Sequence, residues 1–135
     1  MEIEDALTIR LKSTSALTAL IAQRIFPDEA PQNTTLPYLI YLYVSDVKLH
    51  TLTGQYDQEE PMIQFTAYAS TKSAARAITN QVKIALSDFQ GTLSGIYFSY
   101  IRLENEMSSL ITSSDGTIRT YTSDLEYEVN FTKED

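Results

Sequence analysis

The chain has 135 residues, and 18 acidic against 10 basic side chains give it a formal net charge of −8. One domain of this length can bury a core without covalent cross-links. The absence of cysteine excludes disulfides and thiolate metal sites. The acidic balance argues against a protein that grips nucleic acid, because phosphate binding needs clustered lysine and arginine.

The amino-terminal segment predicts two short helices or one broken helix. Residues 1–5 are acidic, unlike the basic start of a signal peptide, and no apolar run approaches the roughly 20 residues of a transmembrane helix. We therefore expect a soluble protein with no membrane partner. Over residues 3–11 the apolar side chains recur at helical spacing, and Ser13–Ser15 can cap a second helical segment over 15–23.

Prolines 27, 31 and 37 forbid regular structure before the first strand, because each fixes φ and removes a backbone donor. The first strand is predicted over 38–45, with apolar residues on both faces, which indicates that both faces are covered. A long polar loop with an acidic run is predicted over 46–60. The second strand is predicted over 62–69, where apolar and polar residues alternate.

An amphipathic helix is predicted over 72–89, with an apolar face made by Ala75, Ile78, Val82, Ala85, Leu86 and Phe89. Gly91 and Gly95 are expected to end it. A third strand is predicted over 96–104 and a polar loop over 105–116, with Asp115-Gly116 as a turn signal. The last strand, 118–131, alternates apolar residues with a row of three carboxylates, Asp124, Glu126 and Glu128.

These elements predict a single α+β domain over residues 1–135. The expected sheet is mainly antiparallel, four-stranded or slightly larger, with two helical segments packed on one face, in the order α-β-β-α-β-β. The connections are too short for helical crossovers between most of the strands, which favours antiparallel pairing.

No catalytic constellation is visible, so we expect neither an enzyme nor a cofactor or metal. The single histidine, His50, falls in the predicted loop without a nucleophile and an orienting carboxylate held beside it. A small hydrolase that uses strand carboxylates such as Asp124 and Glu126 remains an alternative. It requires two opposed acids in a concave pocket.

Separated charge suggests a contact between copies. Lys72, Arg76 and Lys83 fall within about 40° of one another on the predicted helix and form a basic stripe beside its apolar face. Acid gathers elsewhere, in the loop residues Asp57, Glu59 and Glu60. Separated basic and acidic surfaces can bind head to tail and close into a ring, although a basic stripe also fits an ordinary solvated helix face.

The string Arg24-Ile25-Phe26, then Pro31, then Leu36-Pro37-Tyr38 entering an apolar strand resembles the tail-completion family of long-tailed bacteriophages, also described as tail terminators or head–tail joining proteins. Ser45-Asp46 after the first strand, Thr53-Gly54 in the following loop and an alanine-rich helix continue the resemblance over nearly the whole chain. Arg24, Pro37 and Tyr38 match pattern positions, and the resemblance implies structural roles for them: an ion pair, strand entry and a strand anchor.

The resemblance implies a non-enzymatic virion protein that assembles in the host cytoplasm. It implies a ring, commonly of six copies, on the head-facing end of the tail tube. Its partners would be other copies of itself, the tail tube protein and the head connector, with DNA passing through without specific binding. A head-completion or minor tail protein of a phage or prophage is the alternative within the same class.

Overall fold

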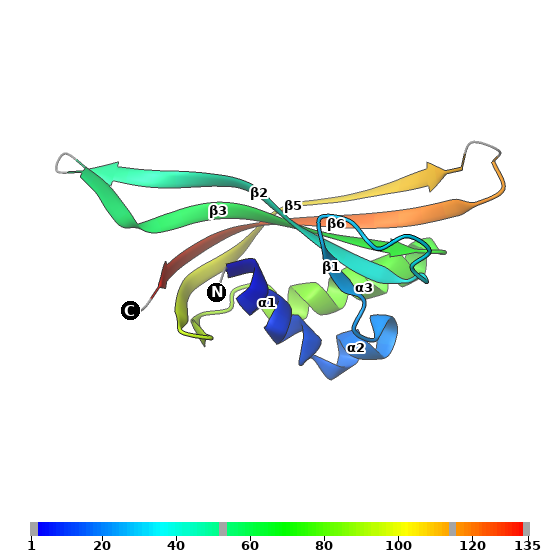
Figure 1. The fold of residues 1–135 in the computed structure, drawn as a ribbon, viewed down its shortest axis with the longest axis horizontal. Helices are drawn as coiled ribbons and strands as arrows, with labels where there is room; N and C mark the ends of the chain where they lie inside the picture. Colours follow the sequence, from blue (N-terminus) through cyan, green and yellow to red (C-terminus); the bar gives the residue numbers. More distant parts are fainter. Residues whose placement is uncertain (1–2, 52–53, 114–115, 134–135) are drawn as a thin grey trace.

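A six-stranded mixed sheet curls along its length and carries three helices on one face (Figure 1). The computed structural model describes residues 3–51, 54–113 and 116–133, and of these it leaves the side chains of 45–51, 54–60 and 133 undescribed. The elements in chain order are α1 (Ile3–Lys12), α2 (Ser15–Ile21), β1 (Ile25–Pro27), β2 (Tyr38–Thr51), β3 (Gly54–Ala69), α3 (Lys72–Leu86), β4 (Gly91–Leu93), β5 (Ile96–Thr112) and β6 (Arg119–Lys133).

The strand order is β1-β2-β3-β6-β5-β4. Strands β2 and β3 pair antiparallel as one long hairpin, and β5 and β6 pair antiparallel as a second. The two hairpins meet where β3 pairs antiparallel with β6, from Glu59 opposite Phe131 to Ala69 opposite Tyr121. The short strand β1 lies parallel to β2 at one edge, and β4 pairs antiparallel with the start of β5 at the other.

The expected four-stranded, mainly antiparallel sheet with two helical segments is wrong: the sheet has six strands and is mixed, and the order is α-α-β-β-β-α-β-β-β. Strands β1 and β4 were missed because each has three residues, too few to show an alternation. The amino-terminal segment forms two short helices, α1 and α2, which is one of the two alternatives expected from the sequence.

Most of the two predicted polar loops is also strand. Residues 46–51 and 54–60 extend β2 and β3, and residues 105–112 extend β5. The described strands of the two hairpins have 14 to 17 residues each, about three times the usual length. His50 therefore lies in β2 and not in a loop, although its side chain is outside the described part.

Helix α3 covers the junction of the two hairpins. Thr71 caps it by accepting a hydrogen bond from the backbone N–H of Ala74 at 3.1 Å. The predicted apolar face is buried from Ala75 to Leu86 and packs on β3 and β6, but the helix ends at Leu86, before Phe89 and the two glycines. The buried Thr79 hydroxyl meets the Ser123 hydroxyl of β6 at 3.0 Å.

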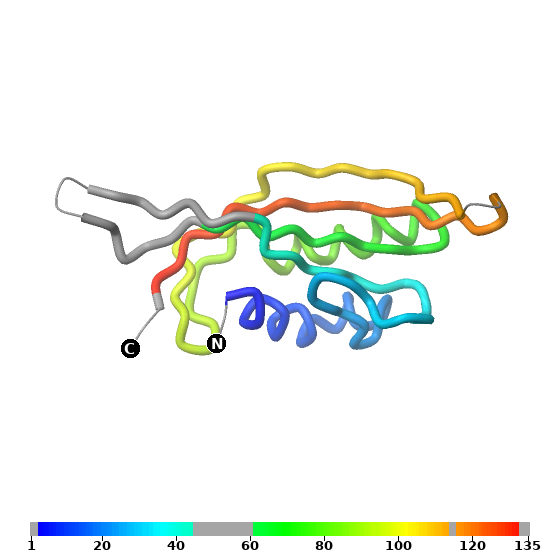
Figure 2. Tube along the Cα trace, turned by 45° about the horizontal axis from the view of Figure 1, so that its top comes forward, coloured from blue at the N-terminus to red at the C-terminus, as the bar shows by residue number. Residues whose placement is uncertain are grey.

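Helices α1 and α2 run beside α3 under the same face of the sheet (Figure 2). The side chain of Arg10 in α1 donates from Nε to the carbonyl oxygen of Ala85 at 2.7 Å, and its guanidinium lies 4.1 Å from the centre of the Phe89 ring. This contact fixes α1 against the end of α3.

Strand β6 has the predicted alternation. Its inward side chains Ser123, Leu125, Tyr127, Val129 and Phe131 are buried, while Asp124, Glu126 and Glu128 are half-buried on the opposite face, which we call the outer face. The helices lie on the inner face, so the core is one layer between the sheet and the helices.

The long strands extend farther than the helices that cover them. Fifteen residues of α3 span about 22 Å, whereas 14 residues of β2 span about 46 Å. The hairpins therefore extend beyond the helix layer toward opposite sides of the molecule (Figure 1). We call the β2–β3 end beside residues 52–53 the first arm and the β5–β6 end around residues 113–118 the second arm.

Candidate interaction surface

The predicted basic stripe lies on α3, and its three members have different surroundings. Lys72 and Arg76 are exposed, and Lys72 lines a shallow pocket of about 220 Å³ with residues of β5 and β6 near the second arm. Lys83 is half-buried, and its Nζ donates to both carboxylate oxygens of Glu106 at 3.0 and 3.2 Å. Lys83 is therefore already paired within its own chain.

The predicted acidic partners, Asp57, Glu59 and Glu60, lie in β3 of the first arm. Their side chains are outside the described residues, so their contacts stay a prediction.

The three family-pattern residues tie β1 to β2. Arg24 donates from Nε to the carbonyl oxygen of Pro37 at 2.8 Å, and its own carbonyl oxygen accepts from the N–H of Leu39 at 2.9 Å. The Leu36-Pro37 peptide bond is cis. Tyr38 then stacks on Tyr68 of β3, with ring centres 5.0 Å apart.

The row of carboxylates on β6 lies on the outer face of the sheet. Neither of the two described pockets includes Asp124, Glu126 or Glu128. Glu128 accepts a hydrogen bond from the Tyr100 hydroxyl at 2.9 Å and lies 3.9 Å from the guanidinium of Arg102. A hydrogen bond with Glu128 raises the pKa of Glu104, and desolvation and the negative charge of Glu128 add to this.

This carboxyl pair is open to water, because the Glu104 side chain is 37% exposed and the Arg102 side chain beside it is 57% exposed. The arrangement is a polar cluster on the outer face of the sheet, outside both described pockets. Within the described parts of the chain, no three metal-ligating side chains gather. None of the described helices is both long and apolar enough to cross a bilayer.

Both edges of the sheet are partly open in the described residues. Strand β4 pairs with β5 only as far as Phe98, and β1 pairs with β2 only as far as Tyr41. From Arg102 to Thr112 and from Val44 to Thr51, no strand in the described residues pairs with the outer edge. Just before this stretch, the carbonyl oxygen of Ile101 accepts from the N–H of Asp88 at 3.0 Å. Such edges offer unpaired backbone donors and acceptors to another strand.

Apolar side chains are exposed near these open edges. They are Leu42, Tyr43 and Val44 on β2, Met107, Leu110 and Ile111 on β5, and Ile118 beside the second arm. Clustered exposed apolar residues mark contact surfaces more often than single ones do. Sequence reasoning missed Met107, Leu110 and Ile111 because it placed 105–116 in a loop. It placed Leu42, Tyr43 and Val44 in a strand that it expected to be covered on both faces.

The comparisons with known proteins find a tail-completion family and a solved virion chain of similar fold. The family model described as "Tail completion protein gp17" matches residues 5–130. A solved chain from "Virion of native gene transfer agent (GTA) particle" has a TM-score of 0.79 and 14% identity, over 96% of this chain and 93% of that chain. A second solved chain, named only by a sequence identifier, has a TM-score of 0.52 and 13% identity over 97% and 98%.

At such identities the two solved structures establish the fold alone. The comparison with curated proteins returned no match. The family match covers nearly the whole sequence and confirms the resemblance carried by Arg24, Pro37 and Tyr38 and their neighbours: the chain belongs to the tail completion protein gp17 family.

Proposed function

We propose that this protein completes a phage tail and joins it to the head connector, as a ring of copies on the end of the tail tube. The observation that carries the tail role is the family match over residues 5–130. The similarity of its fold to a chain of a gene transfer agent virion is in keeping with a place in the particle. It would assemble in the host cytoplasm and act without catalysis.

The open sheet edges support the ring. The free edge of β5 and the free edge of β2 lie on opposite sides of the same sheet, because the strand order runs from β1-β2 to β5-β4. A contact between the β5 edge of one copy and the β2 edge of the next is heterologous, and such contacts close into a ring when the rotation permits. The exposed apolar residues Met107 and Ile111 would be buried in that contact.

The separation of acidic and basic residues also favours a contact between copies. Ala69 follows Glu60 by nine positions of extended strand, and α3 begins soon after it, so the acidic segment and Lys72 lie roughly 30 Å apart in one copy. A contact between them must therefore form between copies. Since Lys83 already pairs with Glu106, Lys72 and Arg76 are the stripe members left for the acids of a neighbour.

DNA would pass through such a ring without adhering. Each copy carries a net charge of −8, and a ring multiplies this charge around its channel.

Electron microscopy of tails made with and without this protein tests the tail role. We expect overlong or headless tubes without it, and attached tails of normal length when the purified protein is returned. Normal attached tails in its absence would refute the role. Immunogold labelling of the finished particle separates the head–tail junction from a head-completion or minor tail position.

A matched pair of variants tests the ring. Ile111→Lys places a charge at the open edge of β5, whereas Ile84→Lys places the same charge on an exposed apolar position of α3. We expect analytical ultracentrifugation in the presence of tail-tube ends to show rings for the wild type and Ile84→Lys, and monomers for Ile111→Lys. Arg76→Glu should also weaken the ring, and rings of unchanged stability in Arg76→Glu would exclude the charge contact.

A further inference from the structure

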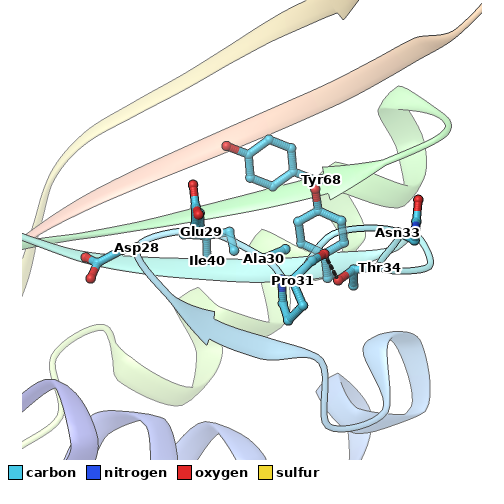
Figure 3. Close-up of a pocket in the computed structure, with 9 residues that line it drawn as sticks. Asp28, Glu29, Ala30, Pro31, Asn33, Thr34, Ile40 and Tyr68 are labelled. Atoms are coloured by element: carbon cyan, nitrogen blue, oxygen red, sulfur yellow. Dashed lines mark hydrogen bonds between the residues drawn. The ribbon is translucent and has the colours of Figure 1, made fainter.

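A pocket of about 330 Å³ opens on the outer face of the sheet, away from the open edge of β5 (Figure 3). Its floor is formed by Tyr38 and Ile40 of β2 and Tyr68 of β3, and its wall by the segment that follows β1. The residues of that wall are Asp28, Glu29, Ala30, Pro31, Asn33 and Thr34. No predicted site residue other than Tyr38 lines it.

Backbone and ring contacts hold the pocket in shape. The N–H of Asp28 donates to the carbonyl oxygen of Tyr41 at 2.9 Å, and the N–H of Glu29 donates to that of Pro27 at 2.7 Å. The Thr34 hydroxyl donates to the carbonyl oxygen of Pro31. The two tyrosine rings stack with an angle of 24° between their planes. The backbones of both acidic residues are therefore anchored. In Figure 3 the Glu29 side chain stands nearer the Tyr68 ring, whereas that of Asp28 points away from it.

The lining has the chemistry of a cation site. Among the described residues, the lining contains two acidic residues and two tyrosines, and no lysine, arginine or histidine. The face of an aromatic ring attracts a cation, and a carboxylate accepts charge-assisted hydrogen bonds from it. The volume accommodates one long side chain.

A similar arrangement that already contains an arginine lies on the same outer face. The guanidinium of Arg102 stands 4.5 Å from the centre of the Tyr100 ring and within 4 Å of the carboxylates of Glu104 and Glu128. There the chain supplies ring, carboxylates and arginine together. The pocket has tyrosine rings and acidic residues, and no arginine is among its described lining residues.

We propose that this pocket binds an arginine side chain presented by a partner protein. Arginine fits better than lysine because its flat guanidinium stacks on a tyrosine ring while its fork of N–H groups reaches a carboxylate. The pocket uses β2 only as far as Ile40 and borders the edge proposed for the ring, which begins beyond Tyr41. It shares no residue with that edge, and the test below uses a peptide and needs no ring.

The test uses the full-length protein and a blocked peptide, Gly-Gly-Arg-Gly-Gly, followed by nuclear magnetic resonance of the tyrosine rings. We expect saturable shifts at Tyr38 and Tyr68 and none at Tyr97, which is remote from the pocket. The same peptide with neutral citrulline or with lysine in place of arginine should bind roughly tenfold or more weakly, as expected for the loss of a charged or forked hydrogen bond.

Two variants complete the test. The double variant Asp28→Asn, Glu29→Gln keeps the shapes of both side chains, and asparagine tolerates the φ of 63° at position 28. We expect it to weaken arginine binding about tenfold. Glu126→Gln, on the same face outside the pocket, should leave binding unchanged. Absence of saturable shifts, equal binding of the citrulline or lysine peptide, or an unaffected double variant would overturn the proposal.

Discussion

Replacing Ile78 with alanine should destabilise the protein much more than the same replacement at Ile84. Both residues lie in α3, but Ile78 is 1% exposed in the core and Ile84 is 73% exposed. The pair has identical chemistry, so helix propensity and the loss of a branched side chain contribute equally at both positions. The difference between the two variants therefore isolates burial.

The expected size follows from the atoms removed. Isoleucine to alanine deletes three carbon atoms, whose transfer from water to the core is worth about 2.4 kcal/mol. Part of the resulting cavity persists between α3 and strands β3 and β6, which raises the cost of Ile78→Ala to about 3 to 4 kcal/mol. For Ile84→Ala the change in the free energy of unfolding should stay within about 0.5 kcal/mol.

Urea denaturation followed by circular dichroism measures both values under the same conditions. The dependence of the free energy on urea should be equal for the two variants, because neither changes the surface exposed on unfolding by much. A difference of less than about 1 kcal/mol between the variants would refute the assignment of this helix face to the core.

Three further predictions concern single contacts. Burial raises the pKa of Tyr127 to about 12 from 10.0, so the neutral phenol stabilises the folded state: this contribution is complete below pH 10 and is lost as the pH rises toward 12. Thermal melts of wild type and Tyr127→Phe between pH 8 and pH 11 should show a steeper loss in the wild type, and parallel curves would contradict the shift. Thr71→Ala removes the cap that accepts from Ala74 and should cost about 1 kcal/mol in urea unfolding, whereas Thr71→Asn, which can still accept, should cost little; equal losses would count against the cap. Arg24→Met keeps the apolar stem but leaves the Pro37 carbonyl oxygen without its donor and should cost about 1 to 2 kcal/mol, while an unchanged midpoint would show that water replaces the donor.

The elements that the sequence predicts well are those with a core on one side and water on the other. Strand β6 alternates cleanly from Tyr121 to Phe131 because the helices cover one face of it, and α3 shows its apolar stripe for the same reason. The segments 46–60 and 105–112 were mistaken for loops. Residues 46–51 and 54–60 extend past the helix layer, so no core imposes an apolar face on them. Residues 105–112 lie on the outer part of β5, where their side chains are exposed.

The candidate surfaces depend on contacts that no local pattern records. Strand β1 pairs parallel with β2 through three residues, so neither its existence nor its direction shows in the sequence. Glu106 reaches Lys83 across 23 positions, and the pocket joins Asp28 with Tyr68, which lie 40 positions apart. Such proximity follows from strand register, which only the folded sheet reveals.

The pairing of β3 with β6 divides the chain into two contiguous stretches. Every other strand pairing lies within residues 25–69 or within residues 91–133 in the described sheet. Tyr121 follows its partner Ala69 by 52 positions, so this seam closes a much larger loop than either hairpin does. Docking of the two stretches should then set the speed of folding. A chain severed between Ser70 and Thr71 would keep each hairpin intact and turn this intramolecular step into the association of two fragments.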